Sequence, residues 1–216
     1  MTLLDSDSGL SRDTVSHAMW QSQISAIDFP QTTPSFLPVE QINANVFPAD
    51  EETVVTQEDN LIEGTTQNDI LNGDRKSNNL AGLAGNDTLN GYGGDDNIIG
   101  GAGNDILFGK MGSDRLNGTD SQNRGSQEYD VLKGGLGKDV FVLGDSDGAY
   151  YISDGNRDYA KINQGFVLGE DTVELSGSRD DYSMRNNKLF FNNDELIAVF
   201  KNAGSVDLNS DSFVFV

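Results

Sequence analysis

The sequence of 216 residues contains no cysteine and only one histidine. The absence of cysteine excludes disulfide bonds and thiolate metal sites. A His-Glu-x-x-His zinc site needs two histidines, so His17 alone cannot build one. A Ser-His-Asp triad would depend on the same His17. We therefore predict that the chain is not an enzyme.

Basic residues and long apolar runs are also scarce. Fourteen Lys and Arg residues face 35 Asp and Glu residues, which gives a net charge of −21. Such a chain repels nucleic acid and anionic membranes, and it suits cations. No run of eighteen apolar residues occurs, so we predict no membrane span and no nucleic-acid partner. The N-terminus lacks the basic and apolar regions of a signal peptide.

The first 60 residues differ in composition from the rest of the chain. All four prolines lie between Pro30 and Pro48, and closely spaced prolines disfavour both helices and sheet ladders. We predict that residues 1–60 form a largely disordered tail and linker. Ser11 could begin a short helix before the prolines. In that case the tail would instead cover an open end of the next domain.

Residues 64–142 repeat a pattern of nine residues eight times, with seven extra residues, 118–124, after the sixth block. Two blocks would make one coil of eighteen residues, in which three-residue strands alternate with six-residue turns. Successive coils would stack about 4.8 Å apart into two parallel sheets. Glycines at places one and four would bend the chain with positive φ. The apolar residues at place eight would point inward; they are Leu71, Leu80, Leu89, Ile98, Leu107, Leu116, Leu132 and Phe141.

The sixth place of each block carries the chemistry. It holds Asp in seven of the eight blocks and Asn78 in the other, and no Lys or Arg recurs in phase with it. Stacking brings each carboxylate beside the one two blocks later, and such pairs repel in a poorly hydrated site. Calcium takes six to eight oxygens, including backbone carbonyls, and fits better than magnesium, which wants strict octahedral geometry. Without calcium, one aliphatic side chain per block buries too little area to offset chain entropy.

The blocks GLAGNDTLN, from Gly82, and GGAGNDILF, from Gly100, resemble the RTX (repeats-in-toxin), hemolysin-type calcium-binding nonapeptide. The resemblance implies an all-β fold, a calcium-binding parallel β-roll over residues 61–143. Each Ca²⁺ would lie between blocks n and n+2, held by both sixth-place side chains and by backbone carbonyls. The residues that it assigns to metal are Asp69, Asp87, Asp96, Asp105, Asp114, Asp130, Asp139, Gly82, Gly85, Gly91, Gly94, Gly100, Gly101, Gly103, Gly109, Gly134, Gly135 and Gly137.

The number of calcium ions depends on two departures from the pattern. Asn78 is neutral, so we expect the site that it shares with Asp96 to be weak or empty. The insertion 118–124 leaves two pairs, Asp105 with Asp130 and Asp114 with Asp139, dependent on whether it loops out. We expect four to six ions.

Residues 144–216 lose the period and predict a small β-rich cap. KLFFNNDELIAVF, from Lys188, predicts a hairpin, and DTVELS and SFVFV predict further strands. Residues 137–177 look like the segment that closes the repeats in many bacterial secreted RTX proteins. The final DSFVFV resembles their type I secretion signal. The resemblance implies a secreted, extracellular or cell-surface location, with the type I secretion machinery as a partner.

These expectations combine into one functional hypothesis. Extracellular calcium would fold the repeats after export, which would support secretion and stability outside the cell. A calcium-dependent adhesin or surface-layer component, or the non-catalytic partner of a secreted enzyme, remain alternatives. The oligomeric state does not follow from the sequence.

Overall fold

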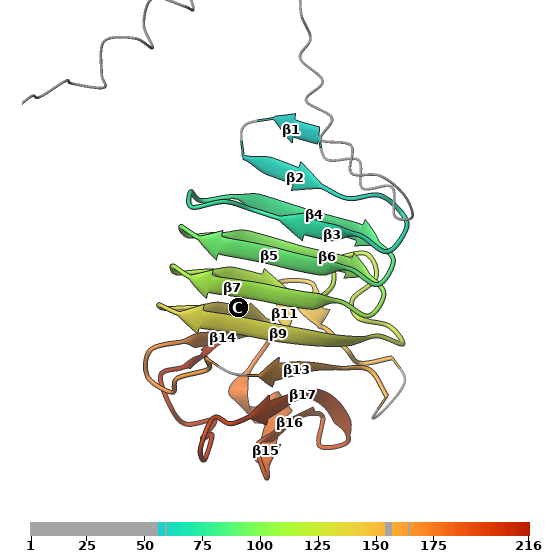
Figure 1. Cartoon of the computed structure of the whole chain (residues 1–216). Helices are drawn as coiled ribbons and strands as arrows, with labels where there is room; N and C mark the ends of the chain where they lie inside the picture. The colour runs from blue at the N-terminus through green and yellow to red at the C-terminus, as the bar shows by residue number, and fades with distance from the viewer. Residues whose placement is uncertain (1–55, 59, 154–156, 164) are drawn as a thin grey trace, which may run out of the picture. The chain divides into compact units, whose positions relative to one another are not determined.

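The computed structural model describes residues 56–58, 60–153, 157–163 and 165–216, and it is almost entirely β (Figure 1). The predictions for residues 1–55, including the helix from Ser11, concern a part of the chain outside these described residues. Within the described part of the chain there is no α-helix, only a 3₁₀ turn, η1, at Arg179–Asp181. No described helix is long and apolar enough to cross a bilayer.

Two sheets of eight strands contain most of the chain. The first, sheet A, has the order β1 (Thr56–Glu58), β2 (Leu61–Glu63), β4 (Asn79–Ala84), β6 (Asn97–Ala102), β8 (Arg115–Asn117), β10 (Val140–Val142), β14 (Thr172–Leu175) and β18 (Phe213–Phe215). The second, sheet B, has the order β15 (Tyr182–Arg185), β16 (Lys188–Phe191), β17 (Glu195–Lys201), β13 (Tyr159–Asn163), β9 (Tyr129–Leu136), β7 (Ile106–Met111), β5 (Thr88–Gly93) and β3 (Ile70–Asn72). A small hairpin pairs β11 (Gly144–Asp145) with β12 (Gly148–Ala149).

The register confirms the coil of eighteen residues and the β-roll. Asn79 pairs with Asn97 and Thr88 pairs with Ile106, both in parallel. Strands β4 to β7 have six residues rather than the three predicted, because the turn residues of neighbouring coils also pair. Leu83, for example, lies opposite Gly101. The backbone of each coil is therefore bonded to the next along most of its length.

The interior of the roll is a narrow column of aliphatic side chains. Every eighth-place residue from Leu71 to Phe141 is 0–1% exposed, as predicted. Aromatic rings close the C-terminal end of the column, where Phe141 packs edge to face against Phe166 with ring centroids 5.9 Å apart. The aliphatic column holds the sheets together and fixes which way the sixth-place side chains face.

The first-place glycines do not take the positive φ that was predicted for them. The fourth-place glycines take positive φ, as in Gly85 (119°) and Gly103 (128°), but the first-place glycines do not. The second bend lies instead at place two, where even Leu83 takes a φ of 75°. The first place needs glycine for space, because a Cβ at Gly82 would lie 2.3 Å from Asp87 Oδ2. This is a packing requirement rather than a conformational one.

The insertion loops out and the register is preserved across it. Leu107 pairs with Leu132, 25 residues later, and Phe141 pairs with Leu116. Gly118, not Gly125 as predicted, takes the first place of its block. The hydrogen bond from the Gly101 N–H to the Gly118 carbonyl at 3.1 Å shows this. The seven extra residues therefore follow Gly118.

The two sheets continue beyond the predicted boundaries at residues 60 and 143. Before residue 61, β1 pairs antiparallel with β2, through a turn in which Asn60 has a φ of 70°. After residue 143, β14 and β18 extend sheet A in parallel, and β13 and β17 extend sheet B. The predicted hairpin is present as the antiparallel pair of β16 and β17, and β15 forms the edge of sheet B beside it. The C-terminal region thus grows from the roll itself.

Candidate metal centre

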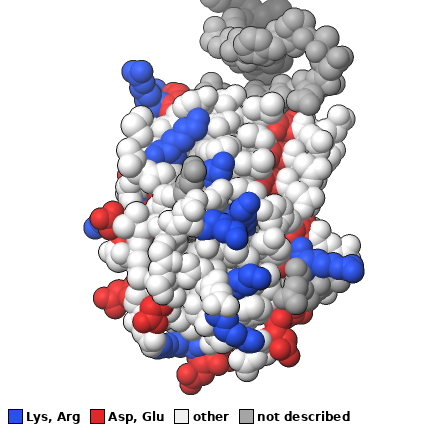
Figure 2. Space-filling model, turned by 60° about the horizontal axis from the view of Figure 1, so that its bottom comes forward, with Lys and Arg blue, Asp and Glu red and all other residues white. Residues whose placement is uncertain are grey.

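Two ladders of carboxylates follow the edges of the roll, and a line of Asp and Glu atoms is visible along the stacked coils in Figure 2. In the first six blocks the backbone N–H of the sixth-place residue donates to Oδ1 of the Asp two blocks later, as from Asp69 to Asp87 at 2.8 Å. One ladder contains Asp69, Asp87, Asp105 and Asp130. The other contains Asn78, Asp96, Asp114, Asp139 and Asp171. These side chains are at most 4% exposed.

The second carboxylate oxygen separates the ends of the ladders from their interior. In Asp87, Asp96, Asp105, Asp114 and Asp139, Oδ2 is buried and has no hydrogen-bond partner. At the ends this atom is satisfied by the protein. Asp69 Oδ2 accepts from the backbone and hydroxyl of Thr65, Asp130 Oδ2 from the Tyr151 hydroxyl at 2.6 Å, and Asp171 Oδ2 from Val167 N–H. A buried acceptor without a donor is costly, so the interior oxygens require another partner.

Four of these five unpartnered oxygens face a backbone carbonyl across the space that a first-place glycine leaves. A Cβ at Gly82 would lie 2.3 Å from Asp87 Oδ2 and 2.4 Å from the Gly100 carbonyl oxygen. A Cβ at Gly100 would lie 2.3 Å from Asp105 Oδ2 and 2.4 Å from the Gly118 carbonyl oxygen. On the other ladder the same arrangement joins Asp96 with Gly109 and Asp114 with Gly134. We call these four spaces the oxygen cradles.

The electrostatics of the metal-free ladders are unfavourable. Burial raises the pKa of Asp87, Asp96 and Asp114 to about 6, and that of Asp105 and Asp139 to about 7. Hydrogen bonds from the neighbouring backbone oppose this shift, and the charge of adjacent acidic side chains adds to it. None of the ladder residues takes part in the ion pairs that Arg115 forms with Glu174 and that Arg124 forms with Asp145.

The oxygen cradles fit calcium. Each offers a carboxylate oxygen and a carbonyl oxygen, the hard ligands that Ca²⁺ prefers. Among the described residues no three acidic or histidine side chains converge on one point. This agrees with a site built from two carboxylates and several carbonyls. Calcium bound there would supply the positive charge that the ladders lack.

The sequence-predicted ligands fall into three groups. The ladder brings together the pairs Asp69–Asp87, Asp87–Asp105 and Asp96–Asp114, and the looped-out insertion also closes Asp105–Asp130 and Asp114–Asp139. The first-place glycines Gly82, Gly91, Gly100, Gly109 and Gly134 lie beside a carboxylate oxygen. The others form the bends, with positive φ at Gly85, Gly94, Gly101, Gly103, Gly135 and Gly137. Their role as ligands stays a prediction.

Sequence reasoning missed several members of this edge. Asp171 continues one ladder through the N–H of Asp139 at 2.9 Å, and its spacing of two residues to Val173 repeats the Asp-x-aliphatic pattern. Glu128 is a further buried carboxylate, whose Oε1 accepts from Gly103 N–H at 2.9 Å. Its charge raises the pKa of Asp105 and Asp130. Fifth-place side chains also stack, as in Asn104 N–H to Asn86 Oδ1 at 2.8 Å.

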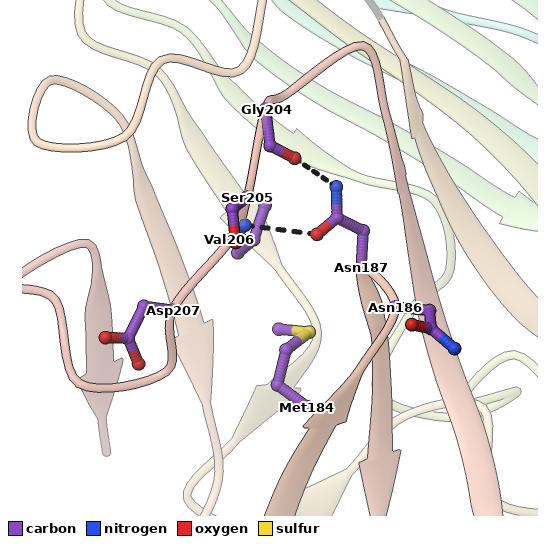
Figure 3. A pocket seen from close by; sticks show the side chains of 7 residues that line it. All are labelled: Met184, Asn186, Asn187, Gly204, Ser205, Val206 and Asp207. Carbon is purple, nitrogen blue, oxygen red and sulfur yellow. Dashed lines mark hydrogen bonds between the residues drawn. The ribbon is translucent and has the colours of Figure 1, made fainter.

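Two other features carry no catalytic arrangement. Residues 144–148 read Gly-Asp-Ser-Asp-Gly, a match to Gly-x-Ser-x-Gly, but they form the β11–β12 hairpin rather than a strand-turn-helix. A hollow near η1 is lined by Met184, Asn186, Asn187 and the segment 204–207 (Figure 3). Asn187 bridges that segment, accepting from Val206 N–H at 3.1 Å and donating to the Gly204 carbonyl. Asn187 therefore has a structural role there.

Comparison with known proteins agrees with the geometry. The family described as RTX calcium-binding nonapeptide repeat matches in four copies, at residues 56–75, 73–107, 82–116 and 124–148. No curated protein sequence matches the chain. The matched residues include both ladders from Asp69 to Asp139 and every residue of the oxygen cradles except Gly118. The chain therefore carries RTX-type calcium-binding nonapeptide repeats, and these repeats form a parallel β-roll.

Proposed function

We propose that calcium is the folding switch of this chain, and that the switch serves export and stability outside the cell. The observation that supports this proposal most directly is the set of four oxygen cradles, in which an unpartnered carboxylate oxygen faces a carbonyl oxygen. Oxygens so placed repel each other unless a cation lies between them. The proposed stoichiometry is four Ca²⁺, one for each cradle.

The thin core supports the same proposal. Each coil contributes two fully buried aliphatic side chains for eighteen residues, such as Leu89 and Ile98. Burial of two such side chains contributes about 3–6 kcal/mol, whereas ordering eighteen residues costs about 1–2 kcal/mol for each residue. Extracellular modules bind calcium at about 10⁻⁴–10⁻³ M, far above a cytosolic concentration. The chain would stay open inside the cell and fold outside.

Limited trypsin digestion of the full chain tests the switch. Trypsin sites lie throughout the roll, at Arg75, Lys110, Arg115 and Lys133. With chelator we expect rapid cleavage at these sites. With millimolar calcium we expect a protected fragment that starts at Asp13, because no Lys or Arg lies between Arg12 and Arg75. Equal protection in chelator and in calcium would contradict the proposal, and so would equal protection by magnesium.

The export part of the proposal rests on the C-terminal segment Asp211–Val216. In the fold this segment forms β18, which pairs with β14, and Phe213 is 7% exposed. A signal of this kind would be readable only before the roll folds. This timing is compatible with a calcium-free chain inside the cell.

Deletion of residues 211–216 tests export in a bacterial host that carries a type I channel. We expect the truncated chain to stay in the cells while the full chain reaches the medium. A second readout, calcium-dependent protection of the purified truncated chain, separates lost export from lost folding. Unchanged secretion of the truncated chain would contradict the export proposal and leave the folding switch intact.

A further inference from the structure

The lysines of this acidic chain gather on one face. Five of its seven lysines lie on the outer face of sheet B, away from the aliphatic column; they are Lys110, Lys133, Lys161, Lys188 and Lys201. Register places Lys161 and Lys188 on either side of Val199, and Lys201 beside Asn163. We call these residues the lysine face. Lys and Arg side chains run across the middle of the surface in Figure 2, with many acidic side chains at its margins.

The lysine face carries charge that the described part of the protein does not neutralise. In the described part of the chain none of the five lysines is in an ion pair, whereas Arg115 and Arg124 are. The outward positions of β5, β7, β9 and β13 hold no acidic residue, and the acidic residue of β16 and β17 is Glu195, at the start of β17. In a chain of net charge −21, this is a local reversal of sign.

Aromatic rings hold several of these cations in place. Lys110 Nζ lies 3.5 Å from the centre of the Tyr92 ring, and Lys133 Nζ lies 4.3 Å from that of Phe108. Arg185 covers Phe190 at 4.6 Å. These contacts limit the freedom of long side chains, so less entropy is lost when an anion binds.

A shallow hollow lies in the lysine face at its C-terminal end. Its lining consists of Tyr129, Tyr159, Lys161, Lys188, Phe190, Leu196, Val199 and Lys201. Tyr129 and Tyr159 pack edge to face, with centroids 4.9 Å apart. Aliphatic and aromatic side chains thus line the hollow together with three lysines.

We propose that the lysine face binds an acidic polysaccharide, a chain of sugar rings that carries carboxylates at regular intervals. Lys161 and Lys188 lie two strands apart, as do Lys133 and Lys201. Two strand spacings are about 9.6 Å, so the cations form a regular array. Carboxylates pair with the ammonium groups, while sugar C–H faces pack on the tyrosines of the hollow.

Other polyanions fit the lysine face less well. Cations already cover the ring faces of Tyr92, Phe108 and Phe190, which leaves little for nucleic-acid bases to stack on. A bilayer is a broad anionic surface that would also meet the acidic margins of the face. A peptide would find few free backbone partners, because the strand backbones are paired in the sheet. A thin sugar chain avoids these conflicts.

The test measures binding of a fluorescently labelled galacturonic-acid oligomer to the full chain in saturating calcium, by fluorescence anisotropy. The face variant is Lys161→Gln/Lys188→Gln. Its matched control is Arg75→Gln/Arg179→Gln, which removes the same charge at two exposed positions outside sheet B. A labelled glucose oligomer, duplex DNA and phosphatidylserine vesicles are the comparison ligands. Circular dichroism confirms that each variant folds, and Lys201→Gln replaces the face variant if it does not.

We expect the face variant to raise Kd for the galacturonic-acid oligomer about tenfold, with the control within twofold of the unmodified chain. The glucose oligomer should not bind. Equal weakening in both variants, or no binding by the unmodified chain, would overturn the proposal. It would also be overturned if DNA or the vesicles bind as tightly and lose binding in the same variant, because the face would then be a general anion surface.

Discussion

Tyr151 donates its hydroxyl hydrogen to Asp130 Oδ2 at 2.6 Å. The equivalent Oδ2 atoms of Asp87 and Asp105, in the same ladder, have no hydrogen-bond partner. The Tyr151 side chain is fully buried, and its ring packs on Gly125, at the end of the insertion. The next residue in this register is Ala160, opposite Asp130, so the carboxylate ladder stops there. A phenol therefore ends the ladder where another calcium ion would lack its second carboxylate.

Tyr151→Phe should destabilise the calcium-loaded chain by about 1–3 kcal/mol, because Asp130 Oδ2 would be buried without a donor. Urea denaturation in saturating calcium measures the effect. Tyr150→Phe is the control, since Tyr150 donates to Asp145, whose side chain is 27% exposed and keeps water as an alternative partner. A Tyr151→Phe midpoint equal to that of the unmodified chain would show that this hydrogen bond is dispensable.

Gly100→Ala should abolish calcium binding in one cradle. Its Cβ would lie 2.3 Å from Asp105 Oδ2 and 2.4 Å from the Gly118 carbonyl oxygen, in the space that the ion needs. Isothermal titration calorimetry should show one fewer calcium ion. The control is Gly93→Ala, whose Cβ would meet no atom closer than 3.8 Å. Unchanged stoichiometry in Gly100→Ala would mean that calcium does not occupy the cradle.

Asn78→Asp should add a calcium ion. Asn78 occupies a ladder position, and its N–H donates to Asp96 Oδ1 at 2.8 Å, but it brings no charge. A carboxylate there would complete a pair with Asp96. Asn79→Asp adds the same charge at an exposed neighbouring position and should not change the stoichiometry. If both variants behave alike, net charge rather than ladder position controls binding.

Acid should favour the metal-free roll and weaken calcium binding. Burial raises the pKa of five ladder carboxylates from 3.8 to about 6–7 in the fold; they are Asp87, Asp96, Asp105, Asp114 and Asp139. A raised pKa stabilises the fold at low pH, and this contribution is lost as the pH rises from about 4 to about 7. In chelator, the β signal should therefore grow as the pH falls from 8 to 5. In calcium, protons compete for the same oxygens, so the calcium midpoint should rise over the same range.

Either of two results would contradict this prediction. Loss of β signal on acidification in chelator would mean that the ladder carboxylates do not limit folding. A calcium midpoint independent of pH would mean that the ion does not displace protons from them.

The repeat made most of the roll predictable. A period of nine residues sets the coil, and the eighth place is the one that is apolar in every block, which identifies the core, as Leu89 and Leu107 show. The ladder pairs follow from the same period, because residues eighteen apart must stack.

The rest depends on contacts between coils or on segments without the period. The need for glycine at Gly82 becomes visible only when the Gly100 carbonyl of the next coil is in place. Asp171 joins its ladder from 32 residues away, and Tyr151 reaches Asp130 only because the insertion loops out. The lysine face combines strands from regular and irregular parts of the chain, so no local pattern shows it.

Far-ultraviolet circular dichroism during a calcium titration tests the folding switch most directly. Starting from chelated chain at neutral pH, we predict little β signal, a cooperative gain as calcium reaches about 10⁻⁴–10⁻³ M, and no gain with magnesium at the same concentrations. Full β signal in the chelated chain, or an equal response to magnesium, would contradict the account.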